Sequence, residues 1–317
     1  MIGFFIPSIF LAYFLAMVVH AELFARKVER KYPPRGKFIT VEGVKLHYVE
    51  KGSGRPVVLL HGDAGSSYDF IISPLLDKLA EKYRVLAFDR PGLGYSQRPS
   101  KDGWSPVVQA RLIRGAVRQL GIEKPVVAGH SRGGATMFAW AMEYPHDMAA
   151  GVGLAPAFLP GSFSMYRFVD IPILSDFLFY FLLYPAERFG LTGITKQTLV
   201  IAFSPDRDPP PEYVDQFWSF MLRRRHMKSG MSDQASGGIL TERIASHYLH
   251  LRVPFVIVNG ASDHNVPAAW AKQAEQILPR AKAVIIQNTG HELMFNCPDE
   301  IVSAVDLAWD MAQTDHT

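Results

Sequence analysis

A serine at position 131 lies within Gly129-His130-Ser131-Arg132-Gly133, which matches the pattern G-x-S-x-G. The β-branched pair Val126-Val127 precedes this pattern, and residues 135–144 after it are compatible with a helix. A serine at the corner between a buried strand and a helix occupies a strained turn that exposes its hydroxyl group. Gly129 and Gly133 are needed in such a turn, because a side chain at either position would collide with the neighbouring strand or helix. We therefore predict that Ser131 is a nucleophile.

A serine nucleophile needs a general base, and the base needs a carboxylate that orients it. Asp263 follows the apolar run 255–258, and His291 follows the apolar run 283–286, with Gly290 before it. Both runs are predicted to be strands, so both side chains lie just beyond a strand end. We predict that Asp263 orients His291 and that His291 takes the proton from Ser131.

Hydrolysis of an acyl group also requires two hydrogen-bond donors for the oxyanion that forms. The backbone N–H of Arg132, at the start of the predicted helix, is one candidate, and the backbone N–H of Asp63 is the other. Gly62 should support the turn that carries Asp63. The side chains of His61, Asp63 and His130 are further candidates for substrate contact, although support of the turn is the main role that we expect for His61 and Asp63.

Five segments together resemble the α/β-hydrolase fold superfamily, in its branch of lid-bearing serine hydrolases and esterases. These segments are HGDAGSS (61–67), FDRPGLGYS (88–96), GHSRGG (129–134), and the turns that contain Asp263 and Gly290-His291. The resemblance extends from about residue 37 to residue 312. It implies that Ser131 is the nucleophile, Asp263 the acid and His291 the base. Related dehalogenases and epoxide hydrolases carry an aspartate where this chain has Ser131, which favours attack on a carbonyl group here.

The order of the predicted elements indicates an α/β fold with a mostly parallel, doubly wound sheet. Strands are predicted at 37–41, 44–49, 56–60, 85–88, 126–128, 151–154, 255–258 and 283–286, and helices at 68–83, 105–120, 135–144, 267–278 and 298–312. Between residues 156 and 251 the alternation gives way to helical segments, including 177–184 and 213–225. The expected organisation is an N-terminal membrane anchor with a basic linker (1–36), a first core part (37–155), a helical lid insertion (156–251) and a second core part (252–317).

The first nineteen residues contain no charged side chain and are long and apolar enough for a membrane-spanning helix. A cleaved signal peptide is the alternative. Basic residues follow the apolar stretch at positions 26, 27, 30, 31, 35 and 37, and none precedes it. Positive charge stays on the cytoplasmic side of a membrane, so we expect an uncleaved single-pass anchor with a cytoplasmic catalytic domain.

Composition excludes several other classes of function. The net charge is only +3, and the basic runs lack interleaved aromatic residues, so we expect no nucleic-acid partner. Cys297 is the only cysteine, which rules out a disulfide within the chain and a cysteine-based metal site. His247 and His250 lie at helical spacing without a carboxylate at ligand spacing, so we expect no metal and no cofactor.

These observations predict a serine hydrolase that cleaves a small-molecule carboxylic ester, lactone or thioester, with a lipophilic substrate, through an acyl-enzyme. Carbon–carbon bond hydrolysis, acyl transfer and cofactor-free perhydrolysis can use the same three side chains. A ligand receptor that retains the fold without turnover is the alternative from another class.

Overall fold

The computed structural model describes residues 2–157 and 172–314, and within them all side chains except those of residues 2–6, 172–173 and 236–242. Residue 1, residues 158–171 of the predicted lid insertion and residues 315–317 lie outside the described part. Eight strands of the described chain form one sheet in the order β1-β2-β4-β3-β5-β6-β7-β8. The strands are β1 (Lys37–Val41), β2 (Val44–Lys51), β3 (Arg55–Leu60), β4 (Tyr83–Phe88), β5 (Val126–His130), β6 (Ala150–Leu154), β7 (Phe255–Gly260) and β8 (Ala281–Ile286).

The sheet is mostly parallel, as predicted. Strand β2 pairs antiparallel with β1 and with β4, and every pair from β4 to β8 is parallel. The register aligns Leu60 at the end of β3 with Gly129 near the end of β5, and Gly260 at the end of β7 with Ile286 at the end of β8. The carboxyl ends of four parallel strands therefore lie at one edge of the sheet, where α/β proteins bind their ligands.

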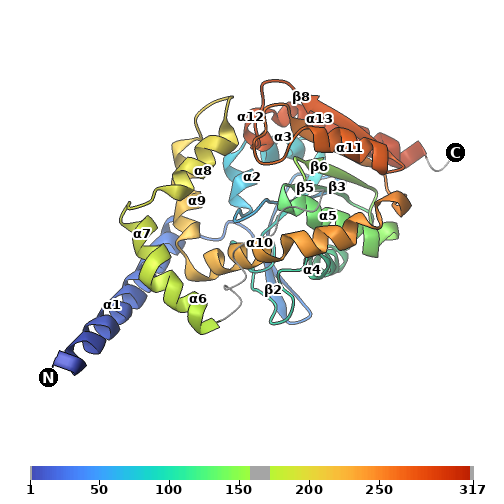
Figure 1. Ribbon diagram of the computed structural model, residues 1–317. Helices are drawn as coiled ribbons and strands as arrows, with labels where there is room; N and C mark the ends of the chain where they lie inside the picture. The colour runs from blue at the N-terminus through green and yellow to red at the C-terminus, as the bar shows by residue number, and fades with distance from the viewer. Residues whose placement is uncertain (1, 158–171, 315–317) are drawn as a thin grey trace.

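Helices cover both faces of the sheet (Figure 1). Because side chains alternate between the faces of a strand, Val58 and Leu60 pack in one cluster with α4 (Pro106–Gln119), α5 (Arg132–Glu143) and α11 (Ala269–Ile277). Val57 and Leu59 pack in the opposite cluster with α3 (Leu75–Ala80) and α13 (Pro298–Gln313). Both faces are thus buried, which explains the continuous apolar sequences of the central strands.

The predicted helix at 68–83 is wrong: two short helices, α2 (Tyr68–Ile72) and α3, occupy this segment, and β4 begins at Tyr83. Ser73 separates the helices with an extended backbone, at φ −74° and ψ 159°. Pro74 follows it, and a proline disfavours the helical conformation in the residue before it. The short helix α12 (Leu293–Asn296) precedes α13 and was not predicted.

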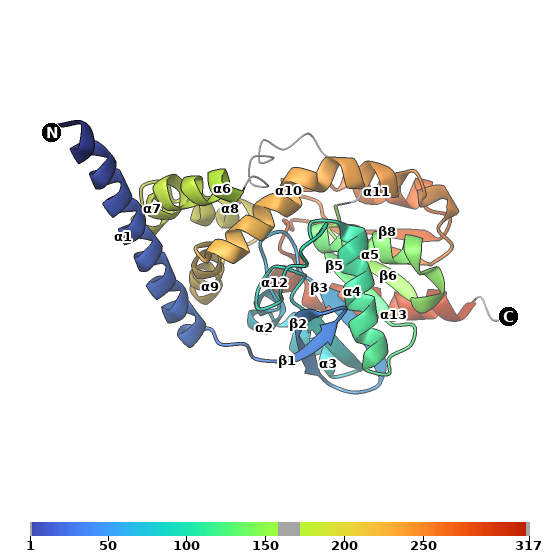
Figure 2. The same ribbon diagram turned by 90° about the horizontal axis from the view of Figure 1, so that it is seen from below.

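A helical insertion connects β6 to β7. It comprises α6 (Pro172–Leu178), the π-helical turn η3 (Phe179–Leu183), α7 (Tyr184–Arg188), α8 (Ile194–Phe203), α9 (Pro211–Met221) and α10 (Arg224–Ala245). Figures 1 and 2 show α10 running along the body of the protein, with α6 to α9 gathered toward one end. The predicted helical segment 213–225 is divided between α9 and α10, because α9 ends at Met221.

The N-terminal helix α1 (Ile2–Lys31) projects from the body beside the insertion (Figure 2). Its residues 7–31 form the candidate membrane span found in the described chain, and the most apolar stretch of 18 residues within it has a mean hydropathy of 1.8. Aromatic rings fix α1 against the insertion: Phe14 lies 5.5 Å from Tyr180 and 5.6 Å from Phe181 between ring centroids. The predicted apolar N-terminal helix is therefore present.

Candidate active site

Ser131 connects the end of β5 to the start of α5 in a backbone conformation that a residue with a side chain rarely adopts. Its φ is 49° and its ψ is −117°. Its N–H donates to the carbonyl of Leu154 (2.9 Å), and its carbonyl accepts from the N–H of Gly134 (2.9 Å) and of Ala157 (2.8 Å). These three hydrogen bonds hold the strained turn between two neighbouring strands and a helix.

The glycines on either side of Ser131 have no room for a side chain. A Cβ atom at Gly129 would lie 2.5 Å from the carbonyl oxygen of Gly133, and one at Gly133 would lie 2.3 Å from the carbonyl oxygen of Leu60. Backbone atoms make both contacts, so neither can be relieved by rotating a side chain. The tight turn therefore requires glycine at both positions, because any side chain there would collide with the backbone.

Asp263 and His291 form a buried pair at the same sheet edge. The Nδ1–H of His291 donates to Oδ2 of Asp263 at 2.7 Å. The other carboxylate oxygen of Asp263 accepts from the N–H groups of Asn265 (2.7 Å) and Val266 (2.9 Å), which fixes its orientation. The N–H of His291 donates to the carbonyl of Ala202 in α8 at 2.8 Å, so the insertion helps to hold the imidazole loop.

The environment of His291 suits a general base. Burial lowers the pKa of His291, but the hydrogen bond and charge of Asp263, with the charge of Glu292, raise it above its usual value. Because Nδ1 carries the proton that Asp263 accepts, Nε2 is left as the basic nitrogen. His291 and Ser131 line the same cavity.

Two backbone N–H groups are candidates for binding an oxyanion: that of Asp63 in the loop after β3 and that of Arg132 at the start of α5. Neither the N–H of Asp63 nor that of Arg132 has a hydrogen-bond partner within the described residues. Gly62 lies against the elbow, because a Cβ atom there would be 2.8 Å from Nδ1 of His130 and 3.2 Å from Cβ of Ser131. The loop thus requires glycine at this position to approach the serine.

Arg90 anchors this loop, a role that the sequence did not suggest. Its Nε–H donates to the carbonyl of His61 (2.9 Å) and its Nη2 to the carbonyl of Gly62 (2.9 Å). Its Nη1 forms an ion pair with Asp233 of α10 (2.9 Å), and both side chains are fully buried. Arg98 also pairs with Asp233, at 2.6 Å. The sequence shows Arg90 only as a basic residue in the turn after β4, and no sequence pattern links it to Asp233.

The histidines predicted as substrate contacts bind protein groups in the structure. The Nδ1–H of His61 donates to the carbonyl of Gly62 (2.9 Å), and its Nε2 accepts from the N–H of Arg90 (2.9 Å). Burial lowers the pKa of His61 to about 3, so this ring is neutral. The Nε2–H of His130 donates to the carbonyl of His291 (3.1 Å). His61 thus supports its turn, whereas His130 supports the His291 loop and also lines the cavity.

The cavity has a volume of about 510 Å³ and contains a polar and an apolar part. Ser131, His291, Gly62 and Asp63 contribute to the polar part. Apolar side chains of the insertion line the rest: Leu183, Ile194, Leu199, Phe217, Met221, Met227 and Met231. Such a volume and lining are typical of a site for a small organic ligand. The described residues contain no group of three His, Cys, Asp or Glu side chains that could hold a metal ion.

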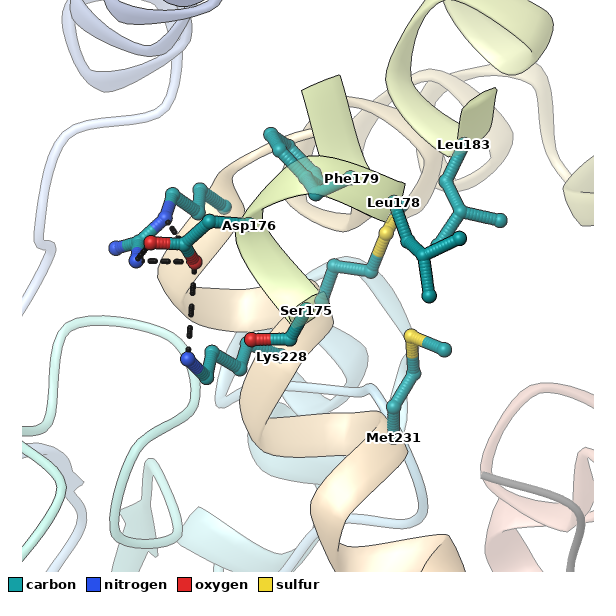
Figure 3. Close-up of a pocket in the computed structure, with 9 residues that line it drawn as sticks. Ser175, Asp176, Leu178, Phe179, Leu183, Lys228 and Met231 are labelled. Carbon is teal, nitrogen blue, oxygen red and sulfur yellow. Dashed lines mark hydrogen bonds and ion pairs between the residues drawn. The ribbon is translucent and has the colours of Figure 1, made fainter. Parts of the chain in front are cut away.

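A second, much smaller pocket lies between α6 and α10 (Figure 3). Asp176 of α6 accepts a hydrogen bond from Nε of Arg224 (3.0 Å) and forms an ion pair with Lys228 (3.7 Å). Leu183 and Met231 line this pocket and also the large cavity. The ion pairs therefore clamp together two helices whose side chains form a wall of the large cavity.

Comparison with known proteins identifies the family. The profile of the family described as alpha/beta hydrolase fold matches residues 55–298. The chain belongs to the α/β-hydrolase fold family. This α/β hydrolase is 25% identical over 261 residues to 2-hydroxy-6-oxo-6-phenylhexa-2,4-dienoate hydrolase of Comamonas testosteroni, over 80% of this chain and 87% of that protein.

Two further comparisons show the breadth of this α/β hydrolase's relatives. A soluble epoxide hydrolase of Corynebacterium sp. (strain C12) is 39% identical over 103 residues, which is 32% of this chain and 35% of that protein. The fold is also similar to a solved membrane phospholipase A described as a bacterial virulence factor, with a TM-score of 0.68, 21% identity and coverage of 99% of each chain. The relatives are thus hydrolases that act on different bonds.

Proposed function

We propose that this α/β hydrolase cleaves a carboxylic ester, lactone or thioester with a lipophilic part, through an acyl-enzyme. Ser131 is the nucleophile, His291 the general base and acid, and Asp263 the carboxylate that orients the imidazole. The backbone N–H groups of Asp63 and Arg132 bind the oxyanion. The hydrogen bond of 2.7 Å between His291 and Asp263, in the cavity that Ser131 lines, is the observation that supports this proposal most strongly.

The proposed reaction has two halves. Nε2 of His291 takes the proton of Ser131 as the serine oxygen attacks the carbonyl carbon, and the resulting imidazolium is stabilised by Asp263. The tetrahedral oxyanion is bound by the two backbone N–H groups and collapses when His291 protonates the leaving alcohol or thiol. Water then attacks the acyl-enzyme with the same base, and Ser131 is regenerated.

Replacing the nucleophile tests the proposal directly. We expect Ser131→Ala to abolish hydrolysis of 4-nitrophenyl esters and labelling by a fluorophosphonate probe. Ser303→Ala is the matched control, because the Ser303 hydroxyl is exposed on α13 and bonds only to the carbonyl of Asp299 within the described residues. Undiminished labelling of the Ser131→Ala protein would refute the assignment of the nucleophile.

Carbon–carbon bond hydrolysis is the second candidate, because the Comamonas testosteroni relative is named as the hydrolase of a 6-oxo-dienoate, which contains no ester bond, and it aligns over 80% of this chain. Offering 2-hydroxy-6-oxo-6-phenylhexa-2,4-dienoate and a series of 4-nitrophenyl esters to the same preparation would decide between them. Added alcohol, or peroxide with acetate, would reveal acyl transfer or perhydrolysis. Binding of substrate without product would indicate a receptor. Ser131 differs from the aspartate that epoxide hydrolases carry at the elbow, which disfavours epoxide opening.

The helical insertion is proposed to act as a lid over a lipophilic substrate. Its apolar side chains line most of the cavity, and Leu199 and Phe217 come from two helices, α8 and α9, that are both outside the sheet. Opening of such a lid would admit substrate, and its closure would exclude water from the acyl-enzyme. A screen of ester chain lengths with and without detergent tests the chain preference and the lid together.

The membrane is proposed as the location of the protein. Helix α1 is long enough to cross a bilayer, and the insertion that packs against it exposes Phe177, Leu182 and Leu191, the last at 77%. Apolar groups at this density beside a candidate span suit contact with lipid. The basic residues at the end of α1, including Arg30 and Lys31, favour a cytoplasmic catalytic domain.

Localisation can be tested in the expression host. The full chain should remain in the membrane pellet after an alkaline carbonate wash, and a C-terminal tag should be protected from protease in intact spheroplasts. A protein that appears in the soluble fraction shortened at its N-terminus would indicate a cleaved signal sequence instead.

A further inference from the structure

Two carboxyl groups that the proposed reaction does not use line the catalytic cavity. Asp69 belongs to α2, and Glu292 follows His291. Asp69 is only 2% exposed and Glu292 only 6% exposed, yet both line the cavity. Asp69 accepts a hydrogen bond of 3.3 Å from the N–H of Ser66, whereas Oε2 of Glu292 is buried and has no hydrogen-bond partner among the described residues.

No positive side chain neutralises these groups within the cavity. Neither lysine nor arginine occurs among the described residues that line it, which include Asp63 and Glu187 in addition to Asp69 and Glu292. Asp63 faces Arg132, with 3.8 Å between its Oδ2 and Nε of the arginine, and Glu187 accepts from the N–H of Thr195 (3.0 Å). Asp63 and Glu187 are only partly buried, so Asp69 and Glu292 are the two buried carboxyl groups of the cavity among the described residues, and neither is paired with a lysine or an arginine there.

Asp69 and Glu292 act on each other and on the phenol of Tyr213. Burial raises the pKa of Asp69 well above its usual value, and the charge of Glu292 raises it further. Burial also raises the pKa of Glu292 to about 7, with Asp263 adding to the rise and His291 opposing it. The pKa of Tyr213 is raised by burial and then by both carboxyl groups. All three side chains line the same cavity, and we call this group its polar corner.

We propose that Asp69 and Glu292 form an acidic subsite that binds a protonated amine of the substrate. This inference rests on the proposed function, because it assigns the amine to a molecule whose acyl group is attacked by Ser131. A buried carboxylate without a partner is costly, and such groups concentrate where a ligand completes their hydrogen bonds.

The chemistry of the corner favours an ammonium group over other ligands. An ammonium group has three N–H donors and no acceptor, so it can donate to both carboxylates at once. Its positive charge would let both carboxyl groups ionise side by side, which burial otherwise prevents. A neutral hydroxyl group offers one donor and no charge, and a carboxylate would be repelled by two groups of its own sign. The apolar wall from the insertion would hold the hydrocarbon part of the same molecule.

Competitive inhibitors with one chain and different head groups test this subsite without assuming which side of the ester carries the amine. We would measure inhibition of 4-nitrophenyl butyrate hydrolysis by heptylamine, heptan-1-ol and heptanoate, with the full-length protein in detergent at about pH 8, where an alkylamine is protonated. Heptylammonium should bind about 10-fold or more tightly than the alcohol, as expected for charge-assisted hydrogen bonds, and heptanoate should bind most weakly. An alcohol that binds as tightly as the ammonium would overturn the proposal.

Amide variants test whether Asp69 and Glu292 cause the preference for the ammonium inhibitor. Asp69→Asn and Glu292→Gln should each reduce the ratio of ammonium to alcohol affinity, and the double variant should bring it to about 1. Glu187→Gln is the matched control, since it removes a charge from the same cavity at a partly exposed position, where solvent screens the charge, and should leave the ratio within about 2-fold. Because the ammonium and alcohol affinities are compared within the same variant, a general loss of activity does not change their ratio. A double variant that keeps the wild-type ratio would show that the two carboxyl groups only share a proton in the cavity wall.

Fluorophosphonate labelling of each variant separates this proposal from the one on which it rests. A wild-type protein that is labelled at Ser131 but shows no ammonium preference refutes the acidic subsite alone. A wild-type protein that is neither labelled nor active on esters refutes the proposed function. If the double variant does not fold, the head-group series on the wild type and on Asp69→Asn still decides the matter.

Discussion

Arg90 and Asp233 join the loop after β4 to the insertion helix α10 through an ion pair of 2.9 Å between fully buried side chains. The same guanidinium donates to the carbonyls of His61 and Gly62, the two residues before the proposed oxyanion donor Asp63. Its burial lowers the pKa of Arg90, with Asp233 opposing this shift. A single side chain thus fixes the loop that carries Asp63 and holds the insertion against the core.

Asp233→Asn should destabilise the protein strongly. The substitution leaves the buried guanidinium of Arg90 without its counter-charge, and removal of one partner of a buried pair typically costs about 3–5 kcal/mol. We expect a clear fall in the midpoint of thermal unfolding, measured by circular dichroism. Asp299→Asn is the control, because Asp299 pairs with Lys78 on the surface and its loss should leave the midpoint unchanged. Equal midpoints for both variants would contradict the importance of the buried pair.

Gly62→Ala should reduce catalysis without unfolding the protein. The added Cβ would approach Nδ1 of His130 to 2.8 Å and displace the N–H of Asp63, and loss of one oxyanion donor lowers kcat by about 10²- to 10³-fold. Gly230→Ala is a matched control on α10. Its Cβ would meet Ala64 of the same loop at an ordinary contact distance of 3.4 Å, so kcat should be retained. The expectation fails if the two variants have the same kcat.

The acid limb of the pH–rate profile should report on His291. Catalysis needs the neutral imidazole, so kcat/KM falls as the pH drops through the pKa of His291, which Asp263 raises above 6.5. In Asp263→Asn the raising charge is lost while burial, which lowers this pKa, remains. The limb should therefore move to lower pH, and kcat should fall by about 10⁴-fold because the imidazole loses its orientation. An acid limb that stays in place would show that another group titrates.

Stability should decrease in mild acid because of His226 on α10. Its Nε2–H donates to the carbonyl of Ala64 (2.7 Å) and its Nδ1 accepts from the N–H of Gly94 (3.1 Å), and burial lowers its pKa to about 4. Between pH 6.5 and about 4 the unfolded chain binds a proton that the folded protein does not. The free energy of unfolding should therefore fall with decreasing pH, by about 1.4 kcal/mol per pH unit for this group.

His226→Gln tests this dependence. Glutamine can donate to Ala64 and does not titrate, so the variant should show a smaller slope of unfolding free energy against pH over this window. His247→Gln, in an exposed position, should leave the slope unchanged. Urea unfolding at several pH values measures both slopes, and a slope that is the same in His226→Gln and wild type would assign the acid sensitivity elsewhere.

Much of the fold follows from local sequence patterns. The apolar runs at 56–60 and 126–128 predict buried parallel strands because both faces of the sheet are covered, and the structure has β3 and β5 there. Strand order and strand ends then place Ser131, Asp263 and His291 at one edge, although their catalytic roles stay predictions. The segment 68–83 is not one helix, because Pro74 disfavours a helical backbone at Ser73.

The remaining features depend on contacts across the insertion, which no local pattern encodes. Helix α10 is 22 residues long although it contains Gly230 and two more glycines, which weaken a helix in isolation. Contacts of Asp233 and His226 with the core hold it in place. Asp69 and Glu292 are 223 positions apart in the chain, and only folding reveals that they share a corner of the cavity.

The turn η3 presents Phe181 to Phe10 and Tyr13 of α1, and Leu183, two residues later, to the cavity that Ser131 lines. If α1 spans a bilayer as proposed, the lipid and the reaction chamber are separated by less than one helical turn of protein. Bilayer thickness and lateral pressure then become physical variables of catalysis, because a force that tilts α1 is applied almost directly to the chamber wall.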